Sequence, residues 1–357
     1  MERVLSVCAN QLSNTYDVTI VTAFQREKED VFALDERIKR IDLNVRTQSS
    51  RKYFLKNPVV HAYKKALTDF LCHHTFDIVI SMGGLDMRFL PKINDGSKKI
   101  LWLHFPFNIA KTWYKSEKGL RNKIYAKVQT YRRIHYTRKF DKVIVLSDAD
   151  KQNWLKYTRN IVRIYNPLTI KNSKNPNYGS KSIISVGRLD YQKGFDYLID
   201  VWKMVSRKHP DWKLNIYGDG PLRKELEAQI RKKELEHTVI LKGVHHNIQA
   251  EYIKHSVYVM SSRTEGFPLV LLEALACGLP IVSFNCPQGP SEIVDHGKNG
   301  FLVDKVGDIS GLSHYLCKLI EDLELRETMG HKALLDAEKY SIDKIINQWN
   351  LLFESLT

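Results

Sequence analysis

The chain has 357 residues, a mass of 41.5 kDa and 43% hydrophobic residues, which favours two domains with substantial cores over one ordinary domain. Its formal charge of +15 lies in the first half, because residues 1–168 hold 31 Lys and Arg against 16 Asp and Glu, whereas residues 169–357 hold 24 of each. No apolar stretch reaches the roughly 20 uncharged residues of a membrane-spanning helix, and the first residues lack the basic head and apolar segment of a signal peptide.

Cysteine usage favours a reducing compartment. The five cysteines are an odd number and show no C-x-x-C spacing, so neither a disulfide framework nor a zinc motif is indicated. The chain is expected to be a cytosolic protein with reduced, mostly buried thiols at Cys8, Cys72, Cys277, Cys286 and Cys317.

The first half opens on a predicted helix, "ERVLSVCANQLS", and continues with short apolar runs that are typical of strands. A Rossmann-like half normally opens on a strand, so the first strand and the loop after it are expected to be missing here. Losing a central strand would expose sheet edges. The strands that remain are expected at residues 17–21, 40–43, 76–80, 99–103 and 142–146.

Residues 110–142 are the most basic segment, with eleven Lys and Arg against two acids and with six interleaved aromatic residues. A basic helix that carries aromatic side chains suits an anionic bilayer, where each cation near the surface contributes about 1 kcal/mol. A solvated basic face is one alternative, and a nucleic-acid surface is another. No base-reading module is visible, so the nucleic-acid surface is the least favoured of the three.

A linker and a repeated strand-helix pattern define the domain organisation. "YNPLTIKNSKNPNYGSKS" is rich in Asn, Pro, Ser and Lys, as linkers are. We therefore expect one domain at residues 1–168, a second at 169–340, and a C-terminal helix at 341–357 that packs back toward the first domain.

The second half alternates strands with helices, which predicts a parallel sheet covered on both faces. The fold class is thus α/β, with two facing Rossmann-like domains and a cleft between them, and ligands are expected beyond the carboxyl ends of the strands. Strands are predicted at 182–186, 213–217, 238–241, 257–260 and 280–284, and helices at 195–208, 221–233, 248–255 and 269–276, with more after 307.

The stretch "EGFPLVLLEALACGLPIVSF" places two acids in the most apolar part of the chain. Pro268 suits a first helical turn, so unpaired backbone N–H groups that could bind a phosphate follow the strand before it. Gly266 allows a close approach of the backbone. Glu273, one turn inside, could accept hydrogen bonds from the hydroxyls of a ribose, and Glu265 from a second sugar. A solvated Glu273 and a capping Glu265 are equally compatible with the spacing.

The same stretch resembles the E-x7-E motif of family 4 glycosyltransferases, which are retaining enzymes of the GT-B fold, and the likeness continues through "GPSEIVDHGKNGFLV". "SVGRLDYQKGFDYLIDVW" and "YGDGPLRKELE" resemble loops of the donor domain. "WLHFPF" resembles a loop of the acceptor domain, and "YNPL" resembles the hinge. The likeness covers nearly the whole chain and is densest from 182 to 303.

The resemblance implies a role for each matching residue. Glu273 would bind the ribose of a sugar nucleotide, Glu265 the transferred sugar, and Arg188 with Lys193 the diphosphate, whose developing charge cations and a helix amino end stabilise without a divalent metal. His104 matches a histidine near the reacting sugar, with a structurally satisfied histidine as the alternative. The backbone of the matched loops would complete the donor site at Gly243, Val244, Gly266, Phe267, Pro268, Leu269 and Val270.

Two further features qualify this interpretation. Relatives begin with a strand and a Gly-rich loop before the segment that "MERVLS" resembles, so either the true start lies upstream or part of the site is lacking. Asp148 and Asp150 form an Asp-x-Asp pair, the metal motif of a different transferase fold, but they follow a predicted strand and are better explained by helix capping.

The sequence thus predicts a retaining, metal-independent hexosyltransferase without cofactor. It would move a sugar from a nucleotide diphosphate donor, UDP-linked for preference, to a hydroxyl of a glycan or polyprenyl-linked saccharide. Such a reaction serves cell-surface polysaccharide synthesis, as in lipopolysaccharide or capsule. The basic half would bind an anionic membrane from the cytoplasmic side. A non-catalytic sugar-nucleotide-binding subunit and a GT-B-type sugar-nucleotide epimerase are the alternatives.

Overall fold

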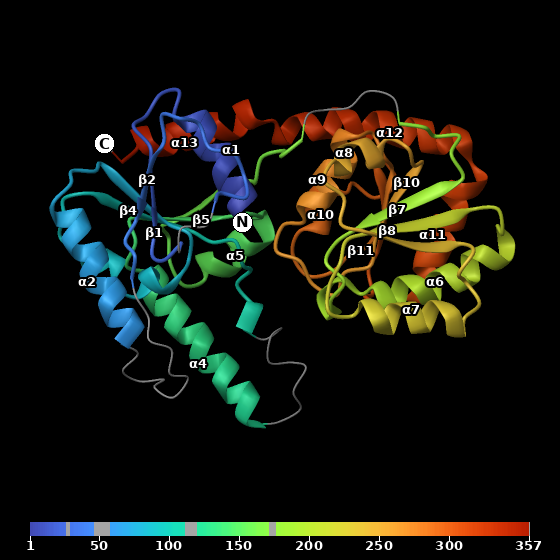
Figure 1. The fold of residues 1–357 in the computed structure, drawn as a ribbon, viewed down its shortest axis with the longest axis horizontal. Helices are drawn as coiled ribbons and strands as arrows, with labels where there is room; N and C mark the ends of the chain where they lie inside the picture. The colour runs from blue at the N-terminus through green and yellow to red at the C-terminus, as the bar shows by residue number, and fades with distance from the viewer. Residues whose placement is uncertain (26–28, 46–57, 111–119, 171–175, 357) are drawn as a thin grey trace. The chain divides into compact units, whose positions relative to one another are not determined.

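The computed structural model describes residues 1–25, 29–45, 58–110, 120–170 and 176–356 (Figure 1). The chain forms two compact units. Unit 1 comprises Met1–Pro167 and Ile342–Thr357, and unit 2 comprises Leu168–Ser341. The C-terminal segment therefore belongs to the same unit as the N-terminal half, and both units are α/β structures built on parallel strands.

Unit 2 contains a sheet of six parallel strands in the order β12-β11-β10-β7-β8-β9. Strands β10 and β11 are entirely buried apolar or small residues, as expected for a parallel sheet with both faces covered. The strands are β7 (Ser182–Val186), β8 (Lys213–Tyr217), β9 (Val239–Gly243), β10 (Val257–Met260), β11 (Ile281–Phe284) and β12 (Gly300–Val303).

Helices cover both faces of this sheet, with α6, α7 and α11 on one side and α8, α9 and α12 on the other (Figure 1). The predicted bounds of α6 and α9 agree with the structure, because α6 carries an apolar stripe and α9 is an apolar run. The sequence patterns predict no strand at β12. The helices are α6 (Phe195–Lys208), α7 (Arg223–Lys232), α8 (Ile248–Tyr252), α9 (Leu269–Ala276), α10 (Pro290–Ile293), α11 (Ile309–Glu321) and α12 (Leu323–Ala337).

Unit 1 contains two separate parallel sheets, one of order β3-β4-β5-β6 and one of the pair β1-β2. The strands are β1 (Thr19–Thr22), β2 (Lys39–Asp42), β3 (Ile78–Ser81), β4 (Lys98–Trp102), β5 (Lys142–Val145) and β6 (Ile161–Arg163). The helices are α1 (Glu2–Leu12), α2 (Pro58–Cys72), α4 (Leu120–Thr137), α5 (Asp148–Leu155) and α13 (Ile342–Glu354), and α13 packs on α1.

The division into two sheets leaves β1 and β3 as edge strands. Among the described residues, β1 pairs only with β2, and β3 pairs only with β4. All four residues of β1 and three of the four in β3 are half-buried, although most are apolar, in contrast to the buried β10 and β11. Val21 and Val79 nevertheless pack on the same hydrophobic cluster. The two edge strands β1 and β3 of unit 1 therefore share one hydrophobic core.

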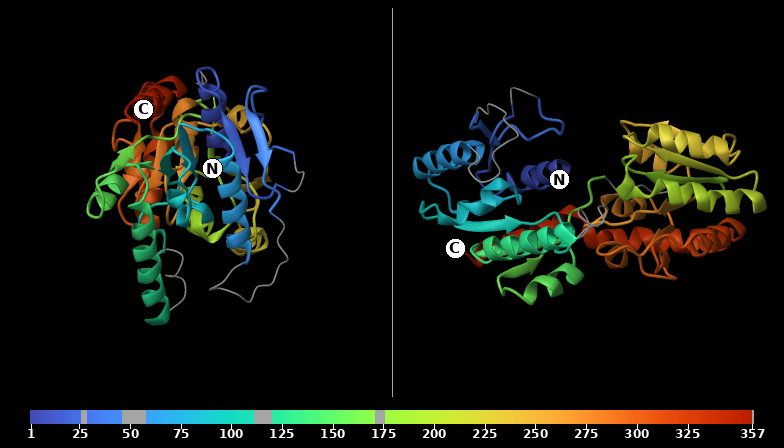
Figure 2. Two further views of the ribbon diagram at one scale, coloured as in Figure 1. Left: turned by 90° about the vertical axis from the view of Figure 1, so that its left-hand side faces the viewer. Right: turned by 90° about the horizontal axis from the view of Figure 1, so that it is seen from below.

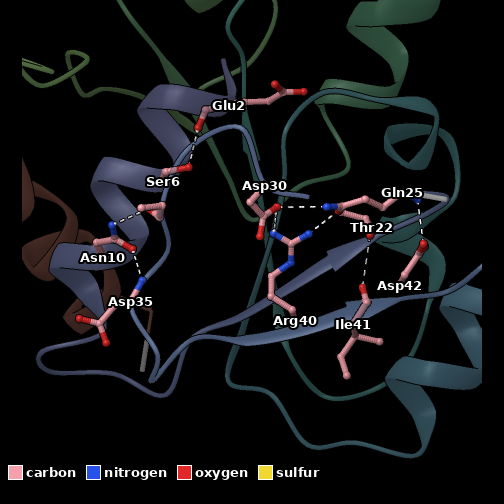
Figure 3. Close-up of polar contacts among 11 residues, drawn as sticks. Glu2, Ser6, Asn10, Thr22, Gln25, Asp30, Asp35, Arg40, Ile41 and Asp42 are labelled. Atoms are coloured by element: carbon pink, nitrogen blue, oxygen red, sulfur yellow. Dashed lines mark hydrogen bonds and ion pairs between the residues drawn. The ribbon is translucent and has the colours of Figure 1, made fainter. Parts of the chain in front are cut away.

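Polar contacts hold the β1-β2 pair and α1 in place (Figure 3). Asn10 of α1 donates to the carbonyl of Ala33 at 3.1 Å and accepts from the backbone N–H of Asp35 at 2.9 Å. Within β2, the guanidinium of Arg40 is paired with Asp30 and bonded to Gln25. These contacts fix the described part of the connection between β1 and β2 to α1 and to β2.

Helix α4 carries residues 120–137 of the basic segment, whereas residues 111–119, including Trp113 and Tyr114, lie outside the described residues. Its amino-terminal half projects beyond the rest of unit 1 (Figures 1 and 2). Among the described helices, none is both long and apolar enough to cross a membrane.

Candidate functional site

The order of strands in unit 2 creates a topological switch point between β7 and β10. From β7 the chain proceeds outward to β8 and β9, and then returns to the other side of β7 to form β10 and the strands after it. Loops that follow neighbouring strands on either side of such a point diverge, and ligands of open α/β sheets bind there. Arg188 and Lys193 lie in the loop after β7, and Glu265 lies in the loop after β10.

Direct contacts join these two loops. Gly194 has a φ of +63°, and a Cβ there would lie 2.2 Å from the carbonyl oxygen of Ser261, so only glycine allows the two backbones to approach this closely. The hydroxyl of Ser261 donates to the carbonyl of Lys193 at 3.0 Å, and the N–H of Arg263 donates to that of Gln192 at 2.7 Å. The loops thus form one rigid surface at the carboxyl end of the sheet.

Lys193 and Glu265 form an ion pair on this surface. The Lys193 Nζ lies 2.8 Å from Oε1 of Glu265, and the hydroxyl of Ser262 donates to the same oxygen at 2.6 Å. Glu265 is only 6% exposed, and the methylene groups of Lys193 pass over Gly187. A buried carboxylate is thereby held in one rotamer by two donors, so Glu265 is neither solvated nor a helix cap.

Glu273 is buried as well, at 4% exposure, within the apolar helix α9. The hydroxyl of Tyr252 donates to its Oε2 at 3.1 Å, and that of Thr169 donates to its Oε1 at 3.2 Å. Burial, followed by the charge of Glu273, raises the pKa of Tyr252 well above its usual range, so the phenol remains a donor. The solvated alternative for Glu273 is therefore wrong.

The amino end of α9 and Arg188 are the next sources of positive potential on these loops. Pro268 is the N-cap residue of α9 and provides no side-chain cap, and Leu269 and Val270 of the first turn are half-buried. Gly266 is half-buried and Phe267 buried in the preceding turn. The Arg188 side chain is 72% exposed, with its Nε 4.0 Å from Asp190. It is thus more accessible to an anion than Lys193, whose side chain is 20% exposed.

A third cluster lies beside the predicted base-binding loop. Gly243 ends β9 with a φ of +75°, and Val244 after it is exposed. Nearby, the hydroxyl of Tyr217 donates to Glu251 at 2.7 Å, and Lys254 pairs with the other oxygen of Glu251 at 2.7 Å. Burial raises the pKa of Glu251, but Lys254 and Tyr217 outweigh this and leave it lowered. The cluster fixes α8 to β8 next to the exposed loop.

In unit 1, His104 follows β4 and begins a loop that is clamped from both sides. Arg133 of α4 donates to the carbonyls of Phe105, Pro106 and Phe107, and the N–H of Phe107 donates to Asp150 at 2.7 Å.

The Asp-x-Asp pair lies in the first turn of α5. Ser147, not an aspartate, is the N-cap residue of this helix. The carboxylate of Asp150 therefore has a structural partner in the His104 loop.

His104 itself is half-buried, with its Nε2 buried and lacking a hydrogen-bond partner among the described residues. Burial lowers the pKa of His104 to about 3, so the imidazole is neutral at pH 7. An unfolded chain has a histidine pKa of about 6.5 and takes up the proton first. The resulting stabilisation is present above about pH 6.5 and is lost as the pH falls toward 3.

Replacing His104 by asparagine is expected to reduce this acid sensitivity. Each unit of pKa difference corresponds to about 1.4 kcal/mol, so urea unfolding between pH 7 and 4 should show a smaller loss of stability in the variant than in the wild type. His61→Asn, at an exposed position of α2, is the matched control and should behave as wild type. An identical pH dependence in His104→Asn and wild type would contradict the assignment.

The structure adds residues that the sequence analysis missed. Ser262 could have been noticed three residues before Glu265 in the same turn. Tyr252 and Thr169 are 21 and 104 residues from Glu273 and share no local pattern with it. Arg133 stands in a basic run that looks solvated, but its own side chain is half-buried, and burial lowers its pKa to about 10.

Comparison with known proteins places this geometry in a family. Residues 168–335 match the family model of glycosyl transferases group 1. An uncharacterised glycosyltransferase of Haemophilus influenzae is 34% identical over 354 residues, which cover 98% of this chain and 94% of the relative. The amylovoran biosynthesis glycosyltransferase AmsD of Erwinia amylovora is 34% identical over 220 residues, which cover 59% of this chain and 61% of AmsD.

A solved structure agrees with the sequence relatives. A variant of TarM from S. aureus, in complex with fondaparinux, α-GlcNAc-glycerol and UDP, superposes with a TM-score of 0.70 at 26% identity over 82% of this chain and 59% of TarM. Structural neighbours of this kind are GT-B glycosyltransferases, consistent with two Rossmann-like domains. The chain therefore belongs to the group 1 glycosyltransferases of the GT-B superfamily.

Proposed function

We propose that this glycosyltransferase moves a hexose from a UDP-sugar to a hydroxyl of a glycan or polyprenyl-linked saccharide in cell-surface polysaccharide synthesis. The observation that carries the proposal is the Lys193–Glu265 pair at the switch point of unit 2, with Glu273 one turn into α9. The amylovoran enzyme supports a role in polysaccharide assembly, and the UDP in the TarM complex supports the nucleotide.

The chemistry of the leaving group explains the basic residues. Breaking the bond between the anomeric carbon and the phosphate leaves negative charge on the β-phosphate, which positioned cations and a helix amino end stabilise as it develops. Lys193 can bind the diphosphate and Glu265 together, because its ammonium has three N–H donors and Glu265 accepts a hydrogen bond from only one of them. Arg188 swings in from solvent, and Gly266 to Val270 contribute the amino end of α9.

The two buried acids, Glu273 and Glu265, bind the two sugars of the donor. In this proposal, Glu273 accepts hydrogen bonds from the ribose and Glu265 from the hexose, while the backbone at Gly243 and Val244 contacts the base. His104, neutral at pH 7, donates or accepts one hydrogen bond near the anomeric carbon without adding a charge. Retention follows from attack of the acceptor on the side from which the diphosphate departs.

Calorimetric titration of the protein with UDP, other nucleoside diphosphates and UDP-sugars tests the donor site. We expect one molecule of UDP per chain and weaker binding of purine diphosphates. Absence of heat with every nucleotide, by protein whose fold is verified by circular dichroism, would contradict the proposal. Binding followed by interconversion of UDP-sugars without transfer would identify an epimerase instead. Binding with no reaction in the presence of acceptor would identify a binding subunit.

The proposal requires no divalent metal for transfer, because Arg188, Lys193 and the α9 amino end carry the compensating charge. Preincubation with EDTA followed by desalting is expected to leave the initial rate within about twofold of the untreated rate, since the stabilising groups are part of the protein. A rate that falls by an order of magnitude and returns on addition of Mg²⁺ or Mn²⁺ would contradict metal independence.

In this proposal, the protein binds an anionic membrane from the cytoplasmic side, as a peripheral protein. On α4, Ile124, Val128 and Tyr131 recur at helical spacing and are all exposed, Tyr131 to 70%. They are accompanied by exposed basic side chains at Arg121, Lys123, Lys127 and Arg132. An apolar stripe flanked by cations on a projecting helix suits insertion at a bilayer surface.

Reversing the charge of Lys123, Lys127 and Arg132 to glutamate is expected to weaken binding to phosphatidylserine-containing vesicles at least about a hundredfold, since each cation contributes about 1 kcal/mol. Arg133 must be left intact, because it clamps the His104 loop. The matched control reverses Lys224, Arg231 and Lys232, which are exposed on α7. Equal sedimentation of both triple variants with vesicles would contradict the membrane surface.

A further inference from the structure

A second cluster of reactive side chains lies on unit 2, away from the donor residues. Helix α6 begins at the carboxyl end of the sheet, after β7, and ends just before β8 begins. Its C-cap residue, His209, is therefore near the amino ends of the strands, opposite the loops that carry Lys193 and Glu265. Helix α11 packs along α6 and ends at Glu321.

Three potential ligands converge where these helices end. Cys317 and Glu321 are four residues apart on α11 and thus share a face. The His209 Nε2 lies 3.0 Å from Oε1 of Glu321, and one ligand atom from each of the three residues lies within 4.8 Å of the others. Cys317 and Glu321 also line a cavity of about 860 Å³. The cluster therefore combines imidazole, thiol and carboxylate beside an open volume.

We propose that His209, Cys317 and Glu321 form a binding site for Zn²⁺, with the fourth coordination position open toward the cavity. Imidazole nitrogen, thiolate and carboxylate are the ligand types that zinc takes, in sets of three plus water or in sets of four. With bonds of about 2.0–2.3 Å, the donor atoms of a tetrahedral site lie roughly 3.3–3.8 Å apart. The observed separations approach this range, and modest adjustment of the Cys317 and Glu321 rotamers closes the site.

The local charges are compatible with a dication. On binding zinc, the Cys317 thiol loses its proton to solvent, so the site contributes one thiolate and one carboxylate, which together neutralise Zn²⁺. Arg207, Lys208 and Lys318 line the same cavity, and the ammonium of Lys318 lies 5.1 Å from the centre of the Phe301 ring. Bound zinc would link the end of α6 to α11 and stabilise unit 2 independently of the donor site.

Cobalt substitution tests the site without reference to sugar transfer. Metal-free protein, with any affinity tag removed, is titrated with Co²⁺ while absorption is recorded. We expect a thiolate-to-cobalt charge-transfer band and intense tetrahedral d–d bands that saturate at one equivalent and disappear on addition of Zn²⁺. Addition of Zn²⁺ is also expected to raise the Tm. Weak octahedral bands without charge transfer would overturn the proposal.

Variants assign the signal to its ligands. Cys317→Ser, a near-isosteric change, should abolish the charge-transfer band. His209→Gln and Glu321→Gln should each lower the affinity for Co²⁺ at least about tenfold, because even changes to residues outside the coordination shell lower metal affinity by that factor. Cys72→Ser is the matched control, because Cys72 is an exposed free thiol of unit 1. Persistence of the band in Cys317→Ser, or its loss in Cys72→Ser, would refute the site.

Zinc protection of Cys317 from maleimide, read by mass spectrometry in wild type, provides a check that does not depend on the folding of any variant. We expect slower labelling of Cys317 with Zn²⁺ and unchanged labelling of Cys72. Equal labelling of Cys317 with and without Zn²⁺ would count against the proposal.

Discussion

Replacing Lys193 by alanine is expected to lower the rate of sugar transfer by about 10²–10³, the usual effect of removing one preorganised group that stabilises developing charge. Lys193 is the cation that the structure already holds at the switch point, 2.8 Å from the buried Glu265. The same change removes the ionic partner of that carboxylate. We therefore also expect a loss of stability of about 3 kcal/mol, at the lower end for a broken buried pair because Ser262 still donates to Glu265.

A double variant separates the two effects. In Lys193→Ala with Glu265→Gln, the buried charge is gone, so the stability to urea should return most of the way to wild type. The rate should remain low, because the cation that faces the diphosphate is still missing. Lys181→Ala, which breaks an exposed ion pair with Asp211, is the matched control and should alter neither quantity. Recovery of the rate in the double variant would remove Lys193 from the chemistry.

Replacing Glu273 by alanine is expected to weaken UDP binding about 10- to 150-fold, because hydrogen bonds to a charged group contribute about 1.5–3 kcal/mol. Glu273 is the buried acid of an otherwise apolar helix, and two hydroxyl donors fix its carboxylate. Equilibrium dialysis with labelled UDP measures the change. Glu225→Ala, at an exposed position of α7, is the control and should bind as wild type. Unchanged affinity in Glu273→Ala would exclude the ribose role.

The hydroxyl of Tyr252 provides a finer test of the same interaction. Tyr252→Phe removes one donor to Glu273 but leaves the carboxylate in place, so UDP affinity should fall by less than in Glu273→Ala. In the double variant Tyr252→Phe with Glu273→Ala, the effect of the tyrosine should vanish, because it acts through the carboxylate. Additive losses in the two single changes would instead indicate that Tyr252 contacts the nucleotide directly.

Much of unit 2 could be predicted from the sequence because its elements carry strong local patterns. β7 and β10 are mostly apolar runs of five and four residues bounded by polar turns, and α6 has a clear apolar stripe. Glu273 could be noticed because it interrupts a local pattern, since a charged residue inside the apolar run of α9 does not contribute to the apolar packing of that helix. Local contrast therefore located the candidate site.

The remainder could not be predicted, because it depends on contacts between segments distant in sequence. Thr169, within the linker, bonds to an acid more than a hundred residues away, which no local pattern reveals. Arg133 stands among surface cations, and only the fold shows that it binds the carbonyls of the His104 loop. β6 has only three residues, too few for a periodic signal.

Transfer of a labelled sugar is the direct test of glycosyltransferase activity in this protein. Wild-type protein is incubated with a panel of labelled UDP-sugars and with glycan or polyprenyl-linked saccharide acceptors, and released UDP and labelled product are quantified together. We expect that one donor yields UDP and product in equal amounts, and that the product keeps the anomeric configuration of the donor in its NMR spectrum. Product of inverted configuration, or UDP binding with no transfer to any acceptor, would contradict the proposed function.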